Sequence, residues 1–188
     1  MAKYIIFMKK KFWSFLELFE TVLIAVIAVV LIRTFIAQPF IVSGSSMEPS
    51  FQSGNYLLVD EFSYYFRAPE RGEVLVFKNP SNESSYYIKR IIGLPGERVI
   101  IDGGKVFIYQ DGKQVAIDEN YIDNSSFDVK NYDTVLDSDE YFVMGDNRGF
   151  SFDSRNWGPL KENKIVGLVR LRLWPISKAT AIEKPQYK

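Results

Sequence analysis

The sequence contains no cysteine and no histidine among its 188 residues. These two absences exclude a disulfide framework, a Cys/His zinc site, a thiol nucleophile and a histidine general base. A carboxylate metal site is still possible, but the spread of the acidic residues is more typical of a solvated surface, and we predict neither a metal nor a cofactor. An enzyme built on this chain must therefore activate a hydroxyl nucleophile with another base.

Neither sign of charge is in excess overall. The 23 basic and 23 acidic residues cancel, but residues 1–40 carry 5 basic and 2 acidic side chains, whereas residues 41–188 carry 18 and 21. Because the larger part of the chain is mildly acidic, we do not expect it to bind nucleic acid. With 47% hydrophobic residues, the chain is long enough for one domain with a core and one additional segment.

One long apolar run distinguishes the N-terminal region. Val22–Ile32 would span only about 16 Å as a helix, whereas Phe19–Ile36 would span about 27 Å, enough for a tilted crossing of a bilayer. Glu20 and Arg33 lie near the ends, where a charge costs least. A cleavable secretory signal is the competing interpretation, because three lysines precede the run, but no small-x-small exit follows it. We predict a retained transmembrane anchor.

The basic residues predict the orientation of this anchor. Four lysines lie within the first eleven residues, and no Lys or Arg lies between Thr34 and Phe66, so the N-terminus should be cytoplasmic. We expect a single-pass protein of the cell membrane, in contact with the lipid bilayer. Its expected parts are a cytoplasmic N-terminus (1–18), a transmembrane anchor (19–37), an extracytoplasmic β-rich domain (38–176) and a C-terminal tail (177–188).

Short runs of Val, Ile, Tyr and Phe, separated by Gly, Asn, Asp and Pro, predict β-strands from Gln38 onward. Residues 98–117 are the clearest case, because they indicate a meander with tight turns at Asp102–Gly104 and Asp111–Gly112. No long amphipathic helical pattern follows Ser43. We therefore predict a mainly β fold after the anchor.

Strands and loops also alternate in the remainder of the chain. Residues 141–144 and 164–174 have the composition of strands. Residues 118–140 are rich in Asp, Asn and Ser, and predict a long surface excursion. The tail after Pro175 is expected to be loose.

A lysine can act as the missing base if its ammonium is made acidic. The pKa of a free lysine is about 10.4, and burial can lower it to roughly 7 or 8. In residues 86–93 (YYIKRIIG), strand alternation places Lys89 on the face of Tyr87 and Ile91 and turns Arg90 to the other face. This segment alone leaves two interpretations open, since a lysine in a strand is more often a solvated edge residue.

Candidate hydroxyl nucleophiles lie in residues 40–50 (FIVSGSSMEPS), where an apolar strand ends in a turn of small residues. Such a turn exposes a hydroxyl and backbone N–H groups that could bind an oxyanion. An ordinary Gly/Ser loop would have the same composition. Ser46 follows Ile36 by ten residues, so it lies at most about 35 Å from the predicted membrane surface and could meet substrates embedded in lipid.

Several sequence boxes occur in the same order as in the type I signal peptidases. Residues 46–50 (SMEPS) resemble the family's S-M-x-P-[ST] box, and residues 53–59 (SGNYLLV) resemble its G-D-x-L-x-V box. Residues 71–77 (RGEVLVF) and 87–97 (YIKRIIGLPGE) are similar to the box that carries the family's lysine. Residues 145–158 (GDNRGFSFDSRNWG) resemble the G-D-N-R-x-x-S-x-D-S-R-x-W-G box.

This resemblance implies an antiparallel β-sheet catalytic domain with a Ser/Lys dyad. It implies Ser46 as the nucleophile and Lys89 as the general base, forming an acyl-enzyme that a water activated by Lys89 then hydrolyses. Ser151 falls where the family places a serine that orients the lysine amine through a hydrogen bond. Asp153 and Arg155 match an ion pair that supports the site, and two residues apart on an extended chain they would share a face.

The resemblance also implies a substrate. It is an exported preprotein that carries a signal peptide, with small residues at positions −1 and −3 of the cleavage site. The sequence does not identify the residues that line the two corresponding pockets, and residues 40–43 and 86–88 are the strand segments we consider for them. No cofactor or metal is implied.

Some positions near the boxes are less specific. Asp146 and Arg148 have the same spacing as the expected ion pair, and Gly145 and Gly149 are expected to be turn glycines. Asn55 replaces the family's usual aspartate, which we expect to be structural.

The residue two before the nucleophile differs between members of the family. Gram-negative members have at this position a serine whose side chain donates to the oxyanion. This chain has Gly44 there, as Gram-positive-type members do. The backbone N–H of Ser46 should contribute to the oxyanion site, and the second donor is not identified. The single span and the short chain are also similar to the Gram-positive form.

Two functions from other classes share part of this pattern. A membrane-anchored β-domain that binds partners without catalysis would have the same composition. Self-cleaving SOS repressors use the same dyad, but they carry a DNA-binding domain and lack a membrane span. A penicillin-binding type of enzyme would need S-x-x-K, which does not occur in this sequence. The sequence gives no indication of the oligomeric state.

Overall fold

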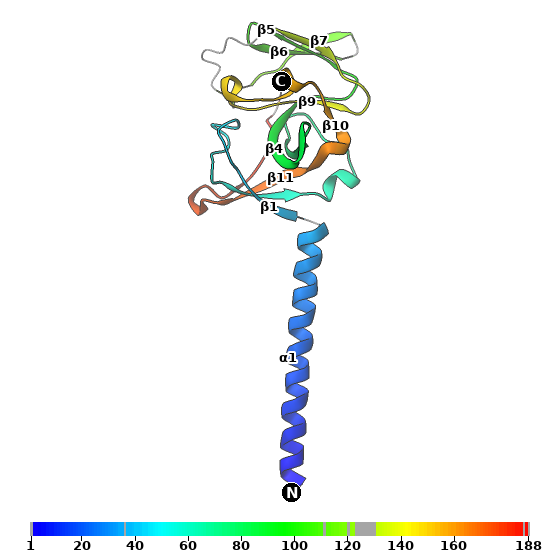
Figure 1. Ribbon diagram of the computed structural model, residues 1–188, viewed down its shortest axis with the longest axis vertical. Coiled ribbons are helices and arrows are strands. Elements are labelled where there is room, and N and C mark those ends of the chain that lie inside the picture. Colours follow the sequence, from blue (N-terminus) through cyan, green and yellow to red (C-terminus); the bar gives the residue numbers. More distant parts are fainter. Residues whose placement is uncertain are drawn as a thin grey trace. The chain divides into compact units, whose positions relative to one another are not determined.

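The computed structural model describes residues 2–35, 37–110, 112–119, 121–122, 131–185 and 187. The chain divides into two compact units, Met1–Ala37 and Gln38–Lys188 (Figure 1).

The first unit is a single helix, α1 (Ala2–Phe35). Within it, Trp13–Val30 is long and apolar enough to cross a membrane, by length and composition only. The side chains of residues 13–30 are exposed, as an apolar surface that faces lipid would be. This stretch begins six residues before the predicted span of residues 19–37, because residues 13–19 include further apolar side chains. Residue 36 of the predicted span lies outside the described residues.

The second unit is built on an eight-stranded sheet in the order β1-β2-β11-β3-β4-β9-β10, with β12 on β11. Consecutive positions of β3 enter opposite cores, because Val74 and Val76 pack in one cluster and Leu75 and Phe77 in another. The sheet is therefore buried on both faces at its centre, where β4 also lies. Its strands are β1 (Ala37–Ile41), β2 (Tyr56–Asp60), β3 (Val74–Asn79), β4 (Asn82–Gly93), β9 (Glu140–Met144), β10 (Leu160–Lys161), β11 (Ile165–Trp174) and β12 (Thr180–Ala181).

A smaller four-stranded sheet has the order β7-β6-β5-β8 and occupies the upper part of Figure 1. It consists of β5 (Arg98–Asp102), β6 (Lys105–Gln110), β7 (Lys113–Ala116) and β8 (Tyr132–Val135). β5, β6 and β7 pair antiparallel, which confirms the predicted meander. The first predicted turn is formed at Gly103–Gly104, whereas Asp111 of the second lies outside the described residues.

Apart from strands, the second unit contains only short helices in the part that the structure describes, as the sequence predicted. They are the 3-10 helices η1 (Ser63–Tyr65), η2 (Arg148–Phe150), η3 (Glu162–Lys164) and η4 (Ile176–Lys178), and the single-turn helix α2 (Ser154–Trp157).

The prediction of a surface excursion over residues 118–140 is wrong in its described part. Residues 132–135 form β8, which pairs antiparallel with β5, and the Glu119, Ile122 and Leu136 side chains are buried. β8 is an edge strand of four residues, none of them buried, and two of them, Asp133 and Thr134, are polar. This composition made a strand resemble a loop.

The prediction of a loose tail after Pro175 is also wrong for the residues that follow η4. Leu171 and Arg172 of β11 pair with β12, and the Ile182 backbone N–H donates to the Arg170 carbonyl at 2.8 Å. The Ile182 side chain packs on the core cluster that contains Val74. A two-residue strand is too short to give a periodic signal.

Gly93, at the end of β4, is expected to be essential for packing of the two sheets. A Cβ at this position would lie 2.5 Å from Val99 Cγ2 and 2.9 Å from Leu136 Cδ1. Both side chains belong to a buried core cluster and would have to move. Gly93→Ala should lower the free energy of unfolding by about 1–3 kcal/mol, measured by urea unfolding in detergent. The control Ser84→Ala, at an exposed position of the same strand, should stay within about 0.5 kcal/mol of the wild type, and equal midpoints for all three proteins would contradict the prediction.

Candidate active site

The central strand β4 carries Lys89 into the interior of the second unit. Lys89 is only 4% exposed and lies opposite Leu75 of β3. Its Nζ is 5.5 Å from the centre of the Tyr87 ring, and Ile91 two residues further is fully buried. The strand alternation therefore placed Lys89 correctly, with Tyr87 and Ile91 on one face and Arg90 on the other.

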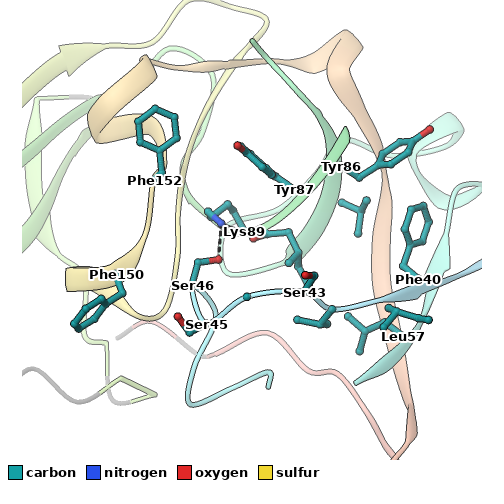
Figure 2. A pocket seen from close by; sticks show the side chains of 15 residues that line it. Phe40, Ser43, Ser45, Ser46, Leu57, Tyr86, Tyr87, Lys89, Phe150 and Phe152 are labelled. Carbon is teal, nitrogen blue, oxygen red and sulfur yellow. Dashed lines mark hydrogen bonds between the residues drawn. The ribbon is translucent and has the colours of Figure 1, made fainter. Parts of the chain in front are cut away.

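Ser46 is held beside Lys89 by the segment that follows β1. This segment reverses at Gly44, whose φ of +97° favours glycine. Directly after Ser46, the side chains of Met47 and Phe51 are buried in the core, and they fix the position of the loop. Lys89 Nζ donates to Ser46 Oγ at 2.7 Å and to the Ile88 carbonyl at 3.0 Å (Figure 2).

The surroundings of Lys89 change its acidity. Burial lowers the pKa of the Lys89 amine to about 8, against the charges of Asp153 and Asp146, which raise it, while the charge of Arg155 lowers it further. Burial dominates because an ammonium without water loses most of its solvation. The amine is thus far more often neutral at physiological pH than an exposed lysine.

Residues 145–147 contact the backbone of the Ser46 turn. The Asn147 N–H donates to the Ser46 carbonyl at 3.0 Å, and Asn147 Nδ2 donates to the Ser45 carbonyl at 3.1 Å. A Cβ on Gly145 would overlap both the Ser46 carbonyl oxygen and Ser151 Oγ. Gly145 is therefore required by this close approach and not by a turn conformation, which corrects the expectation from the sequence.

Asp153 and Arg155 form the expected ion pair. Arg155 Nε donates to Asp153 Oδ1 and Nη2 to Oδ2, both at 2.8 Å. Asp153 Oδ2 also accepts from the Gly145 N–H at 3.0 Å. Burial opposes the charge of Asp153, but the hydrogen bonds from Arg155 and Gly145 hold the pKa of its carboxyl below the usual value.

The local geometry of this pair differs from the prediction. Asp153 is not part of an extended strand shared with Arg155, because it is the N-cap of α2. Its side chain accepts from the Arg155 backbone N–H, and the Asn156 side chain accepts from the Asp153 N–H, which completes a capping box. Aspartate, one of the preferred N-cap residues, was the signal for this helix start in the sequence.

Ser151 lies close to Ser46 and Lys89, but the two hydrogen-bond partners of Lys89 Nζ among the described residues are Ser46 and Ile88. The buried Ser151 hydroxyl instead helps to lower the pKa of the Asp153 carboxyl. Ser151 nevertheless adjoins Gly145 and the Ser46 carbonyl.

Two further buried ion pairs were missed by the sequence analysis. Arg90 Nε and Nη2 donate to the two carboxylate oxygens of Asp146 at 2.8 and 2.6 Å, and Arg148 Nη1 donates to Glu119 Oε2 at 2.6 Å. Asp146 and Arg148 therefore have separate partners, although their spacing resembled that of Asp153 and Arg155. Their partners lie 56 and 29 residues away, beyond the reach of a local spacing pattern.

A cavity of about 340 Å³ opens beside the dyad. Residues 40–43 and 86–88, the two strand segments considered from the sequence, line it together with Ser46 and Lys89. Leu57, Val76, Phe150 and Phe152 complete much of its wall (Figure 2). No three acidic side chains of the described ranges converge as a metal site would require.

Comparisons with known proteins identify the family of the chain. A family model described as signal peptidase, peptidase S26, matches residues 15–174. The chain is 41% identical over 170 residues to the probable signal peptidase I-2 of Synechocystis sp., an alignment that covers 87% of this chain and 75% of that protein. It is 35% identical over 175 residues to signal peptidase I V of Bacillus subtilis, covering 86% and 98% of the two chains.

Among solved structures, a signal peptidase I from Enterococcus faecalis has a TM-score of 0.47 and 27% identity, and covers 55% of this chain and 97% of that one. The family model extends over most of the chain, from α1 to the end of β11, and includes Ser46, Lys89 and residues 145–158. The Synechocystis and Bacillus relatives align over more than four fifths of the chain. By these matches, the chain belongs to the type I signal peptidases of peptidase family S26.

Proposed function

We propose that this chain is a membrane-anchored serine endopeptidase that removes N-terminal signal peptides from exported preproteins with a Ser46/Lys89 dyad. The observation that carries the proposal is the buried amine of Lys89, 2.7 Å from the Ser46 hydroxyl, at the edge of a cavity. The signal peptidase relatives support peptide-bond cleavage of such substrates. The proposed orientation, from the lysines of the first eleven residues, has a cytoplasmic N-terminus and an extracytoplasmic catalytic unit.

The first half of the proposed reaction is acylation. The neutral Lys89 amine accepts the hydroxyl proton of Ser46 while Oγ attacks the scissile carbonyl carbon. The ammonium then gives this proton to the leaving amine, and an ester between Ser46 and the signal peptide remains. With a pKa of about 8, roughly a tenth of the amine is neutral at pH 7, against about 0.04% for a free lysine.

The second half of the reaction is hydrolysis of this ester. Lys89 takes a proton from a water molecule, the hydroxide attacks the ester carbonyl, and the proton returns to Ser46 Oγ as the signal peptide leaves. Gly44 lacks a side chain that could donate to the oxyanion, so the backbone N–H of Ser46 is the donor we assign.

The cavity beside the dyad would hold the residues before the cleaved bond. Its walls include the end of β1, the two residues that follow it, and residues 86–88 of β4, which suits a substrate in an extended conformation. A limited volume with apolar walls favours small side chains at positions −1 and −3 and disfavours large ones.

Loss of either dyad residue should abolish cleavage of a preprotein in detergent or lipid. Ser46→Ala removes the nucleophile and Lys89→Ala the base, so each should lower kcat/KM by at least about 10³-fold. For the wild type, kcat/KM should rise with pH to a plateau with an apparent pKa of about 8, because the neutral amine is the active form. Near-normal activity of Lys89→Ala would contradict the assignment of the base, and a folded wild type that cleaves nothing would favour a binding domain without catalysis.

Burial of Lys89 should also destabilise the protein below pH 8. Its pKa is about 8 in the folded protein against 10.5 when exposed, so the penalty on the charged form is complete below pH 8 and disappears above 10.5. Lys89→Met should therefore raise the free energy of unfolding at pH 7 by up to about 3 kcal/mol, and the gain should vanish near pH 10.5. Lys105→Met, at an exposed position, should change stability by less than about 0.5 kcal/mol at either pH. A Lys89→Met variant that is less stable than the wild type at pH 7 would refute this account.

The two members of the Asp153/Arg155 pair should shift the pH profile in opposite directions. Asp153 raises the pKa of Lys89 and Arg155 lowers it, so Asp153→Asn should move the midpoint of kcat/KM below that of the wild type and Arg155→Gln should move it above. Arg98→Gln breaks the exposed ion pair with Asp133 on the smaller sheet and should leave the midpoint unchanged. Shifts of the same sign for both site variants would show that the pair acts through structure and not through its charges.

A further inference from the structure

The face of β4 that is opposite to Lys89 carries a buried layer of ion pairs. Arg90 follows Lys89 directly and turns to the other face, where its side chain and that of Asp146 are both at most 5% exposed. The second pair, Arg148 with Glu119, is equally buried. None of these four residues lines the cavity beside Ser46.

Two tyrosines cover this layer. The ring of Tyr121 lies 4.4 Å from the guanidinium carbon of Arg90, and its hydroxyl donates to Glu119 Oε1 at 2.9 Å. Tyr187 packs edge-on against Tyr121, with ring centroids 6.5 Å apart and the two hydroxyl oxygens 3.4 Å apart. Tyr187, which follows β12 in the sequence, thus adds to the cover that Tyr121 provides.

Tyr187 contacts a glycine, Gly72, that is also hydrogen-bonded to the buried ion pairs. A Cβ on Gly72 would lie 2.9 Å from Tyr187 Cε2, so the ring rests directly on the backbone there. Arg90 Nη1 donates to the carbonyl of this same Gly72 at 2.8 Å. Tyr187 therefore contacts the layer in two places, through Tyr121 and through Gly72.

The layer is connected to the nucleophile through residues 145–148. Arg148 Nε donates to the Gly145 carbonyl at 3.1 Å, and Asp146 is held by Arg90. Between these two anchored positions, the Asn147 N–H donates to the Ser46 carbonyl at 3.0 Å. Residues 145–148, which contact the Ser46 turn, are thus held in place by the buried ion pairs.

We propose that Tyr187 is a positioning residue for catalysis, which closes this layer to water and thereby holds residues 145–148 against the Ser46 turn. Ion pairs keep a single geometry when water cannot compete for the guanidinium and carboxylate groups. If water enters, the 145–148 segment gains freedom, and the Ser46 hydroxyl loses part of its alignment with the Lys89 amine. The inference rests on the proposed function of the dyad.

A positioning role differs from a merely stabilising one in the kinetic constants. Small displacements of a reacting group lower kcat strongly, whereas KM should hold because the layer lies behind the cavity. A tyrosine that only adds to stability would change neither constant at a temperature where the protein is folded.

The test compares Tyr187→Ala, Tyr187→Phe and the control Tyr65→Ala in the full chain, in detergent with a preprotein substrate. Tyr65 is 81% exposed on η1, and its replacement should leave kcat within about twofold. Tyr187→Ala should lower kcat about tenfold with KM within about twofold, and Tyr187→Phe, which keeps the ring on Gly72 and Tyr121, should restore kcat to within about twofold. Amide hydrogen exchange of residues 145–148 should be faster in Tyr187→Ala.

An unchanged kcat for folded Tyr187→Ala, or a change in KM alone, would overturn the inference. If Tyr187→Ala does not fold, Tyr187→Leu, which removes the ring but keeps an apolar side chain, should lower kcat at constant KM, and an unaltered kcat would overturn the inference equally. Ser46→Ala separates the two proposals: a wild type no more active than Ser46→Ala contradicts the proposed function. In that case, hydrogen exchange still decides whether Tyr187 holds residues 145–148.

Discussion

The placement of one lysine amine out of water is the constraint on which the rest of the site depends. A base with a pKa near 8 requires burial, because burial is the largest cause of the shift at Lys89. A strand in the interior of a sheet provides this burial, and β4 has β3 on one side and β9 on the other. The same two neighbours determine what is packed around the amine: Leu75 is directly opposite, and the strand order brings residues 145–148, which follow β9, to the Ser46 turn.

The charges around the amine are arranged so that burial keeps its effect. Asp153 and Asp146 both raise the pKa of Lys89, and two unpaired carboxylates there would stabilise the ammonium. Each carboxylate has an arginine of its own, since Asp153 binds Arg155 and Asp146 binds Arg90. The charge of Arg155 lowers the pKa of Lys89 against the two carboxylates, and desolvation is the largest influence. Arg155 thus serves the acidity of the lysine as well as the ion pair with Asp153.

Local patterns in the sequence were sufficient for most of the strands, the membrane-length helix and the face of β4 that carries Lys89, and insufficient for the contacts between distant segments. Alternation placed Lys89 and Arg90 on opposite faces, and a spacing of two suggested Asp153 with Arg155. The same spacing failed for Asp146 and Arg148, because a buried charge takes whichever partner the fold brings near. β8 and β12 were missed since one is a half-polar edge strand and the other has two residues. The helix start at Asp153 could have been found, because aspartate is one of the preferred N-cap residues.

The small number of hydrogen bonds at the Lys89 amine fits its acidity. An ammonium has three N–H groups, and within the described residues Lys89 Nζ donates only to Ser46 and Ile88. A third acceptor would stabilise the charged form and raise the pKa. If Ser151 accepted a hydrogen bond from the ammonium, as the sequence implied, the amine would be a poorer base at neutral pH. A hydroxyl that lies near the dyad but is not bound to the amine leaves the ammonium one partner short, and this deficit acts in the same direction as burial.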